Sequence, residues 1–312
     1  MGLFANTAVC CFALISGYFI HSVSLPTKKI VKTAGIIWFY SVLVLVLALL
    51  IPELRAYMTP SLLIVELTPI LSNMSWYGST YFVSLFFVPL IALSIRYLET
   101  RRKLFTYMIV VMASFFSIVG TVTPINSFVS DLAWFIFLYY LAIYIRTFYS
   151  KVSKKNSLLI AIAVIILVSV GWLSLWILQS RISLFGKLYK NLIGRYSFFT
   201  LALGVSLFNI FRQMEFKSRI INLIASSTFG IYLLHDNQIF RKFLWHDLFH
   251  TEVLGGDMYC FVYLILFSSI IFLCGMVIDL IRKLLLDKSW SKFSDWISLK
   301  VGDTNIKLGF NE

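Results

Sequence analysis

Charged residues are scarce in this 312-residue sequence, at 13% of the total, and only 14 residues are acidic. A soluble globular domain carries about a quarter charged residues. Hydrophobic residues make up 60% of the chain, and its mean hydropathy is +0.88. This composition excludes an ordinary soluble domain and predicts an integral membrane protein.

Glycine and proline are also sparse, with 15 and 6 residues, and the apolar runs between them are long and uninterrupted. Such runs predict membrane-spanning helices, because membrane strands show short segments of alternating hydrophobicity. The four cysteines lie inside apolar runs, where they behave as small hydrophobic residues. The chain has no phosphate-binding P-loop, dinucleotide glycine motif, G-x-S-x-G turn or H-E-x-x-H motif, so no soluble-enzyme chemistry is indicated.

We expect an all-α, polytopic transmembrane helix bundle with about nine spans, since a span needs roughly 20 apolar residues. The expected spans are residues 7–25, 34–51, 77–95, 104–122, 128–145, 158–178, 196–211, 221–240 and 258–281. The segment 60–69 adds a buried or re-entrant piece. Residues 1–286 therefore form a transmembrane domain, and residues 287–312 a partly amphipathic cytoplasmic tail on the membrane surface.

The basic residues set the expected orientation. The net charge of +13 suggests nucleic acid as a partner, but lysine and arginine gather in short clusters between the apolar runs. When the loops are assigned alternately to two sides, one side collects 20 of the 27 basic residues. That side is expected to be cytoplasmic, which places the C-terminus inside and the N-terminus of this chain outside. Topology thus explains the charge, and we expect membrane lipid rather than nucleic acid as a partner.

The segment SSTFGIYLLHDNQIF, residues 226–240, begins as a membrane helix and then carries His235, Asp236 and Asn237 in a row. One interpretation is that these residues end the span among lipid headgroups. The other is a functional site, because polar groups at membrane depth are costly and three in a row cover almost a full turn. A histidine beside a carboxylate can accept a proton from a hydroxyl.

Other polar groups also have two interpretations. His246 and His250 are four residues apart on a predicted helix face, which suits either a metal or an interfacial helix. Without a clear third ligand we expect no metal. The cluster from Lys28 to Lys32 either follows the inside-positive tendency or binds phosphates. Trp76 and Tyr77 suit an interfacial aromatic belt.

Three stretches together resemble the acyltransferase-3 family of membrane proteins. CCFALISGYFI (10–20) resembles its F-F-x-I-S-G-Y/F-L segment, and MSWYGSTYFVSLFFVPLIAL (74–93) its helix that runs from a W-Y/F pair to a proline. STFGIYLLHDNQIFRKFLW (227–245) is similar to its late G-I-Y-L-x-H-D/E-N stretch, as found in Gram-positive surface-polysaccharide members. The order and spacing of the three match across nearly the whole chain.

The resemblance implies a bundle of about ten helices, with no bound cofactor, that transfers an acyl group from a cytoplasmic coenzyme A thioester to a sugar hydroxyl. It implies acetyl-CoA as the donor and a lipid-linked or cell-surface glycan as the acceptor, in a bacterial plasma membrane. We assign its roles to the matching positions as hypotheses, with catalysis by His235 and Asp236, glycan binding by Asn237, Arg241, Trp76 and Tyr77, and donor binding by Lys29 and Lys32. The last two keep the spacing of the family's R-x-x-R motif with lysines.

One departure from the family leaves alternatives open. In the family a first helix precedes the S-G-Y segment and carries an arginine and the usual catalytic histidine, whereas this chain starts at the second helix. The odd number of expected spans points to the same missing helix, through a misassigned start or a truncation. The alternatives are an inactive truncated member and a transporter or flippase of lipid-linked sugars, although we find none of the inverted repeats typical of transporters.

Overall fold

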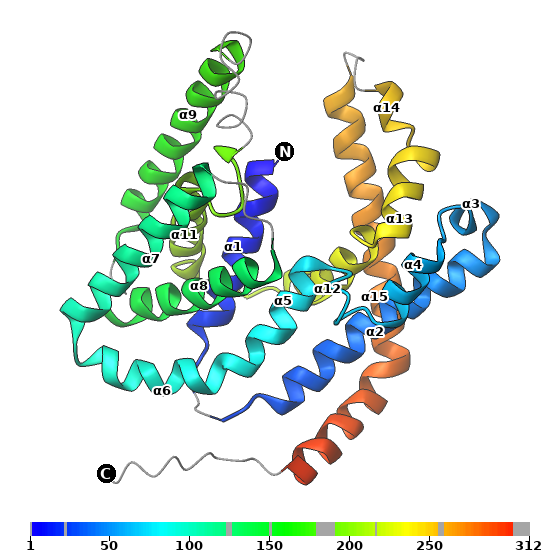
Figure 1. Ribbon diagram of the computed structural model, residues 1–312, viewed down its shortest axis with the longest axis horizontal. Helices are drawn as coiled ribbons and strands as arrows, with labels where there is room; N and C mark the ends of the chain where they lie inside the picture. The colour runs from blue at the N-terminus through cyan, green and yellow to red at the C-terminus, as the bar shows by residue number, and fades with distance from the viewer. Residues whose placement is uncertain are drawn as a thin grey trace. The chain divides into compact units, whose positions relative to one another are not determined.

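The computed structural model describes residues 2–21, 24–122, 127–149, 152–178, 191–215, 217–254 and 259–301. Every regular element within these ranges is a helix (Figure 1). The expectation of an all-α polytopic chain is therefore confirmed.

Six helical stretches in the described residues are long and apolar enough to cross a membrane. They are Thr27–Leu50, Trp76–Glu99, Arg102–Gly120, Phe128–Phe148, Lys154–Leu178 and Cys260–Lys300. Two expected spans, 7–25 and 196–211, correspond to shorter apolar helices, Ala5–Tyr18 and Phe198–Arg212. The expected span 221–240 is not one continuous helix, because its helix ends at His235.

The chain forms two compact units, each made, within the described residues, of two separate parts of the sequence. The first takes in the described residues up to 25 and from 87 to 215. Its helices are α1 (Gly2–Tyr18), α6 (Val88–Glu99), α7 (Arg102–Val122), α8 (Phe128–Phe148), α9 (Lys154–Leu178) and α11 (Phe198–Arg212). A short 3₁₀ turn, η1 (Leu85–Phe87), leads into α6.

Close helix packing in the first unit depends on small residues. A Cβ atom on Gly17 of α1 would lie 2.6 Å from the Cα of Tyr139 on α8, so only glycine permits this approach.

Asp131, buried in the first turn of α8, accepts hydrogen bonds from Arg195 and Tyr196. These contacts bring the loop before α11 onto α8.

The second unit takes in residues 26–86 and the described residues from 217 to 301. Its first part holds α2 (Thr27–Leu50), α3 (Pro52–Arg55), α4 (Pro60–Leu67) and α5 (Trp76–Ser84). Its second part holds α12 (Arg219–His235), α13 (Gln238–Lys242), the π-helix η2 (Phe243–Leu248), α14 (Thr251–Leu254) and α15 (Cys260–Val301). The residues 287–301 continue α15 as helix, and residues 302–312 of the expected tail lie outside the described part of the chain.

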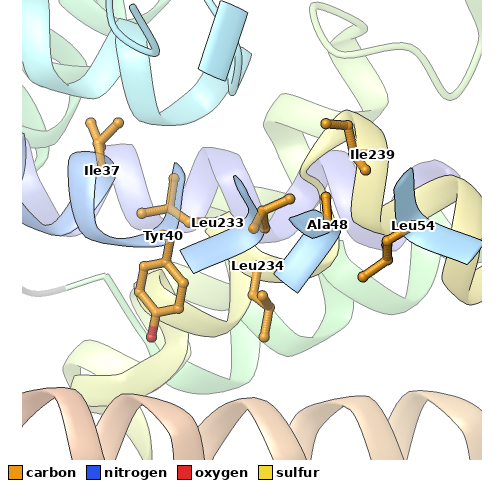
Figure 2. Close-up of a cluster of buried hydrophobic side chains, with 8 residues drawn as sticks. Ile37, Tyr40, Ala48, Leu54, Leu233, Leu234 and Ile239 are labelled. Atoms are coloured by element: carbon orange, nitrogen blue, oxygen red, sulfur yellow. The ribbon is translucent and has the colours of Figure 1, made fainter. Parts of the chain in front are cut away.

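One buried face of α2 organises the core of the second unit. Its members recur every three or four residues, as one face of a helix requires. The core consists of Ile37, Tyr40, Val44 and Ala48 of α2 with Leu54, Leu233, Leu234 and Ile239 (Figure 2). The residues that follow α12 are thereby fixed against α2.

Tyr40 also links three helices of this unit through its hydroxyl group. The hydroxyl donates to Asp279 of α15 across 2.9 Å, and both groups lie against Gly230 of α12. A Cβ atom on Gly230 would lie 2.3 Å from the Tyr40 Oη, so glycine is required where α12 crosses α2. Asp279 in turn pairs with Arg282 at 2.8 Å and with Lys283 at 2.9 Å, which compensates the charge of a carboxylate that is only 1% exposed.

Candidate functional site

The polar triplet at 235–237 lies at a break between two helices. α12 ends at His235, and Asp236 occupies the position after it. Asn237 then caps α13, because its side-chain oxygen accepts hydrogen bonds from the backbone N–H groups of Ile239 and Phe240, at 3.0 and 3.2 Å. The cap replaces two of the missing bonds of the first helical turn, which stabilises the turn of the chain at this point.

A buried carboxyl group fixes this break from the other side. Glu66 of α4 is 0% exposed, and its Oε1 accepts a hydrogen bond of 2.7 Å from the Asn237 side chain. Its Oε2 accepts from Ser41 of α2, also at 2.7 Å. Burial raises the pKa of Glu66, while the two hydrogen bonds oppose that rise. Asn237 is only 1% exposed and holds the break in place; its expected contact with a glycan stays a prediction.

His235 and Asp236, the two residues expected to be catalytic, contact different partners. The Nδ1 atom of His235 lies 2.9 Å from the carbonyl oxygen of Ile231. Since a carbonyl only accepts, Nδ1 carries the proton and Nε2 is the basic nitrogen. Asp236 does not orient His235: it accepts from the hydroxyl of Tyr232 at 2.8 Å and pairs with Arg241 at 3.1 Å.

A row of aromatic rings joins this break to the basic end of α2. The row consists of Tyr81, Tyr77 and Tyr232, which we call the tyrosine row. The Lys29 ammonium lies 5.4 Å from the centre of the Tyr81 ring, and Tyr81 stacks on Tyr77 with centroids 6.1 Å apart. Tyr77 meets Tyr232 edge-on at 5.1 Å, and Tyr232 meets His235 at 5.8 Å. The tyrosine row thus connects Lys29 with His235, which are far apart in the sequence, within the second unit.

The polar rim of the tyrosine row is a short hydrogen-bond chain. Ser75, the cap of α5, donates to the Tyr232 hydroxyl at 3.1 Å, and Tyr232 donates to Asp236. Trp76 follows Ser75 and packs edge-on against Tyr77 at 6.1 Å. Three residues expected at the site from the sequence, Tyr77, Asp236 and His235, therefore contact Tyr232, and Trp76 lies against Tyr77.

Lys29 and Lys32 line a groove of about 460 Å³ between the start of α2 and the C-terminal part of α15. We call it the lysine groove; Lys28, Asp287, Trp290, Ser291, Ser294 and Asp295 complete its lining. Three ammonium groups on one wall suit an anionic, phosphate-bearing ligand.

Carboxylates from α15 already face the lysines of this groove. Lys28 pairs with Asp295 at 2.7 Å, and Lys32 lies 3.6 Å from Asp287. The indole of Trp290 lies against α2 at Gly35, where a Cβ atom would come within 2.7 Å of the ring. The α15 segment is therefore held on α2 by packing as well as by charge.

The prediction that His246 and His250 share one helix face is wrong. His246 lies in η2, which ends at Leu248, and His250 follows it with a positive φ of 45°. Within the described ranges, no three His, Cys, Asp or Glu side chains are placed to hold a metal ion.

Sequence reasoning missed Tyr81, Tyr232 and Glu66. Two of them carried a local signal, because Tyr77 and Tyr81 are four residues apart, as are Tyr232 and Asp236, and such pairs meet on a helix surface. Glu66 carried none, since its partner Asn237 is distant in the sequence.

Comparison with models of protein families matches residues 2–279 to an acyltransferase domain, that of the acyltransferase-3 family. The match covers most of the chain, including α2, the tyrosine row and the break after His235. Comparison with curated proteins and with solved structures gave no match.

Proposed function

Since the chain belongs to the acyltransferase-3 family, we propose that it is a membrane O-acyltransferase that transfers an acetyl group from acetyl-CoA to a sugar hydroxyl. The proposed acceptor is a lipid-linked or cell-surface polysaccharide of a bacterium. The observation that carries this proposal is the continuous contact from Lys29 through the tyrosine row to His235.

The lysine groove is the proposed donor site. Coenzyme A carries several phosphates on one end and its thioester on the other, so its phosphates suit Lys29 and Lys32. We place the rest of an extended donor beside the tyrosine row, in which Tyr81 and Tyr232 are half-buried and Tyr77 is buried. This arrangement leads the thioester from the groove toward His235.

His235 is the proposed proton acceptor. Its Nε2 atom takes the proton of the sugar hydroxyl while the hydroxyl oxygen bonds to the thioester carbonyl carbon. The C–S bond then breaks, and the leaving thiolate takes the proton back from the imidazolium. The Ile231 carbonyl at 2.9 Å stabilises the charged ring during this exchange and fixes its tautomer.

Residues around the break are the proposed acceptor side of the site. Trp76 presents aromatic surface to a sugar ring, with the buried ring of Tyr77 packed behind it, and Arg241 presents a side chain that is 52% exposed. Asn237 acts here as a positioning residue through Glu66. The protein would lie in the bacterial plasma membrane with the lysine groove, and hence α15's C-terminal part, at the cytoplasmic side.

The proposal is tested with Lys29→Ala and His235→Ala in purified protein in lipid nanodiscs, with release of the coenzyme A thiol and O-acetylation of the surface polysaccharide as readouts. Lys29→Ala is expected to raise the KM for acetyl-CoA about tenfold with little change in kcat, because a binding contact is lost. His235→Ala is expected to lower kcat by about 10²- to 10⁴-fold.

Lys155→Ala is the matched control, since Lys155 is an exposed lysine at the start of α9 in the other unit. Its kinetics should equal those of the native chain. Full activity of His235→Ala would remove this histidine from the mechanism, and an unchanged KM in Lys29→Ala would remove the donor assignment. If the protein moves glycan across the membrane without acetyl transfer, it is a transporter and not an acyltransferase.

A further inference from the structure

A second polar pocket lies in the same unit, beyond the C-terminal end of α2. It has a volume of about 550 Å³ and is lined by Tyr57, Arg241, Lys242, Trp245, His246 and Glu252, together with Thr251. We call it the histidine pocket. The proposed reaction uses only Arg241 of this set, so the other groups have no assigned role.

His246 is hydrogen-bonded to a carboxylate, an arrangement that is typical of histidines that accept protons. Its Nδ1 atom lies 2.7 Å from Asp247 Oδ1, and the same oxygen accepts from the Tyr57 hydroxyl at 2.8 Å. Asp247 therefore holds the proton on Nδ1 and leaves Nε2 as an acceptor. The nearest ion-pair partner of Nε2, Glu252, is 3.9 Å away, so the nitrogen is open to a ligand.

The backbone that presents these groups is unusual. Trp245 and His246 belong to the π-helix η2, whose last bond runs from Phe249 N to Leu244 O, five residues back, at 3.0 Å. π-helical turns are rare and occur frequently at functional sites. The next turn leaves His250 at a positive φ of 45°, a conformation that side chains other than glycine rarely adopt. A purely structural interfacial helix would need neither feature.

The charges of the pocket define the ligand. Arg241 is already paired with Asp236 at 3.1 Å, whereas no carboxylate in the described part of the chain lies within ion-pair distance of Lys242. Lys242 is thus the cation available to an anionic group, while the carboxylate of Glu252 faces His246 across 3.9 Å. Trp245 supplies a flat apolar surface, and Glu252 and His246 supply acceptors for hydroxyl hydrogens. From this arrangement we infer that the histidine pocket binds a monoanionic sugar, with its acidic group on Lys242 and its ring on Trp245.

The position of the pocket agrees with an acceptor rather than a donor. α2 contains 24 residues, about 36 Å at 1.5 Å per residue, which is enough to cross the bilayer. The lysine groove lies at its first turns, and Tyr57 lies beyond its last residue. That the bound sugar is the acyl acceptor rests on the proposed function; the binding itself does not.

The test is a titration of ¹⁵N-histidine-labelled full chain, in nanodiscs of phosphatidylcholine alone, with D-glucuronate, D-glucose and acetate. His246 is one of four histidines, and its signals are assigned with His246→Gln. Glucuronate is expected to shift the His246 signals saturably, and glucose and acetate to need at least tenfold higher concentrations. His250→Asn, whose side chain is outside the pocket lining, serves as the control and should bind glucuronate as the native chain does.

Two variants test the contributions of the ligand's acidic group and of its sugar ring separately. Lys242→Gln should weaken glucuronate at least fivefold and leave glucose unchanged, whereas Trp245→Leu should remove the preference for glucuronate over acetate. Equal responses to acetate and glucuronate would overturn the inference in favour of a nonspecific anion site. So would an unresponsive His246, or displacement of glucuronate by phosphatidylglycerol in the disc, which would identify a lipid headgroup site. Unaltered signals of the other histidines show that each variant is folded, and loss of acetyl transfer with intact sugar binding would reject the proposed function alone.

Discussion

Glu66 shows how much a single buried residue decides in this protein. It is 0% exposed, yet both of its carboxyl oxygens have donors, one from Ser41 on α2 and one from Asn237 at the break after α12. A buried carboxyl that bridges two elements stabilises their contact only while its partners remain. The position of His235 and Arg241 therefore depends on an acid that is far away in the sequence.

Glu66→Gln is expected to fold, because a glutamine oxygen can accept from Asn237 and its amide can donate to Ser41. Glu66→Ala removes both acceptors and should lower the free energy of unfolding by about 2–4 kcal/mol. Thermal unfolding in detergent, followed by tryptophan fluorescence, measures both. Equal melting temperatures for the two variants would show that the carboxyl group does not hold the break.

The pH dependence of the same variants has a definite sign. Burial raises the pKa of Glu66 above its unfolded value of about 4.3, so the folded state prefers the protonated form. Stability is then full below the unfolded pKa and is lost as the pH rises through the folded pKa. Glu66→Gln should gain melting temperature over the native chain as the pH rises through that window and gain none below it.

At the scale of single elements, α15 is the helix with two roles. Its apolar part is long enough to cross the membrane, and its later part brings Asp287, Trp290 and Asp295 to the lysine groove. Because Asp295 faces Lys28 at 2.7 Å, an anionic ligand competes with a carboxylate of the protein itself. The helix thereby limits the affinity of the groove.

Asp295→Asn should tighten donor binding, with the KM for acetyl-CoA reduced about two- to fivefold. The pair is largely exposed, at 67% and 49%, so its strength is about 0.2–1 kcal/mol and the effect should shrink in high salt. Glu215→Gln, at an exposed acid of the other unit, is the control for net charge. A KM that rises in Asp295→Asn would mean that the aspartate helps to build the groove.

At the scale of the whole molecule, the two ends of α2 should lie on opposite faces of the membrane. In a variant whose four cysteines are replaced by alanine, Lys292→Cys and Glu53→Cys place single thiols at exposed positions near each end. A membrane-impermeant maleimide should label Glu53→Cys in intact cells and Lys292→Cys only in inverted vesicles. The reverse pattern would invert the orientation expected from the basic residues, and labelling of both from one side would reject α2 as a span.

The sequence predicts the helical, membrane-spanning fold well, because run length and hydropathy are local properties that the bilayer selects directly. It could not place the end of α12 at His235, because the cap on Asn237 is completed by Glu66, 171 residues away. It does predict Lys29, Tyr77 and His235 as candidate site residues. Lys29 lies in a basic cluster, Tyr77 in an aromatic pair and His235 in a polar triplet within an apolar segment. It could not show that Tyr81 and Tyr232 connect them, since that contact arises only when α5 packs against α12.

The π-helical winding of η2 also determines what the deletion of a single codon would do to the protein. A π-turn accommodates one residue more than an α-turn, so deletion of a single codon between 243 and 248 would let ordinary winding resume. Because the extra residue is accommodated by slower winding, the parts of the chain on the two sides of the deletion would keep about the same relative direction. The histidine pocket would therefore depend on which codon is lost, because only Trp245 and His246 of this segment line it.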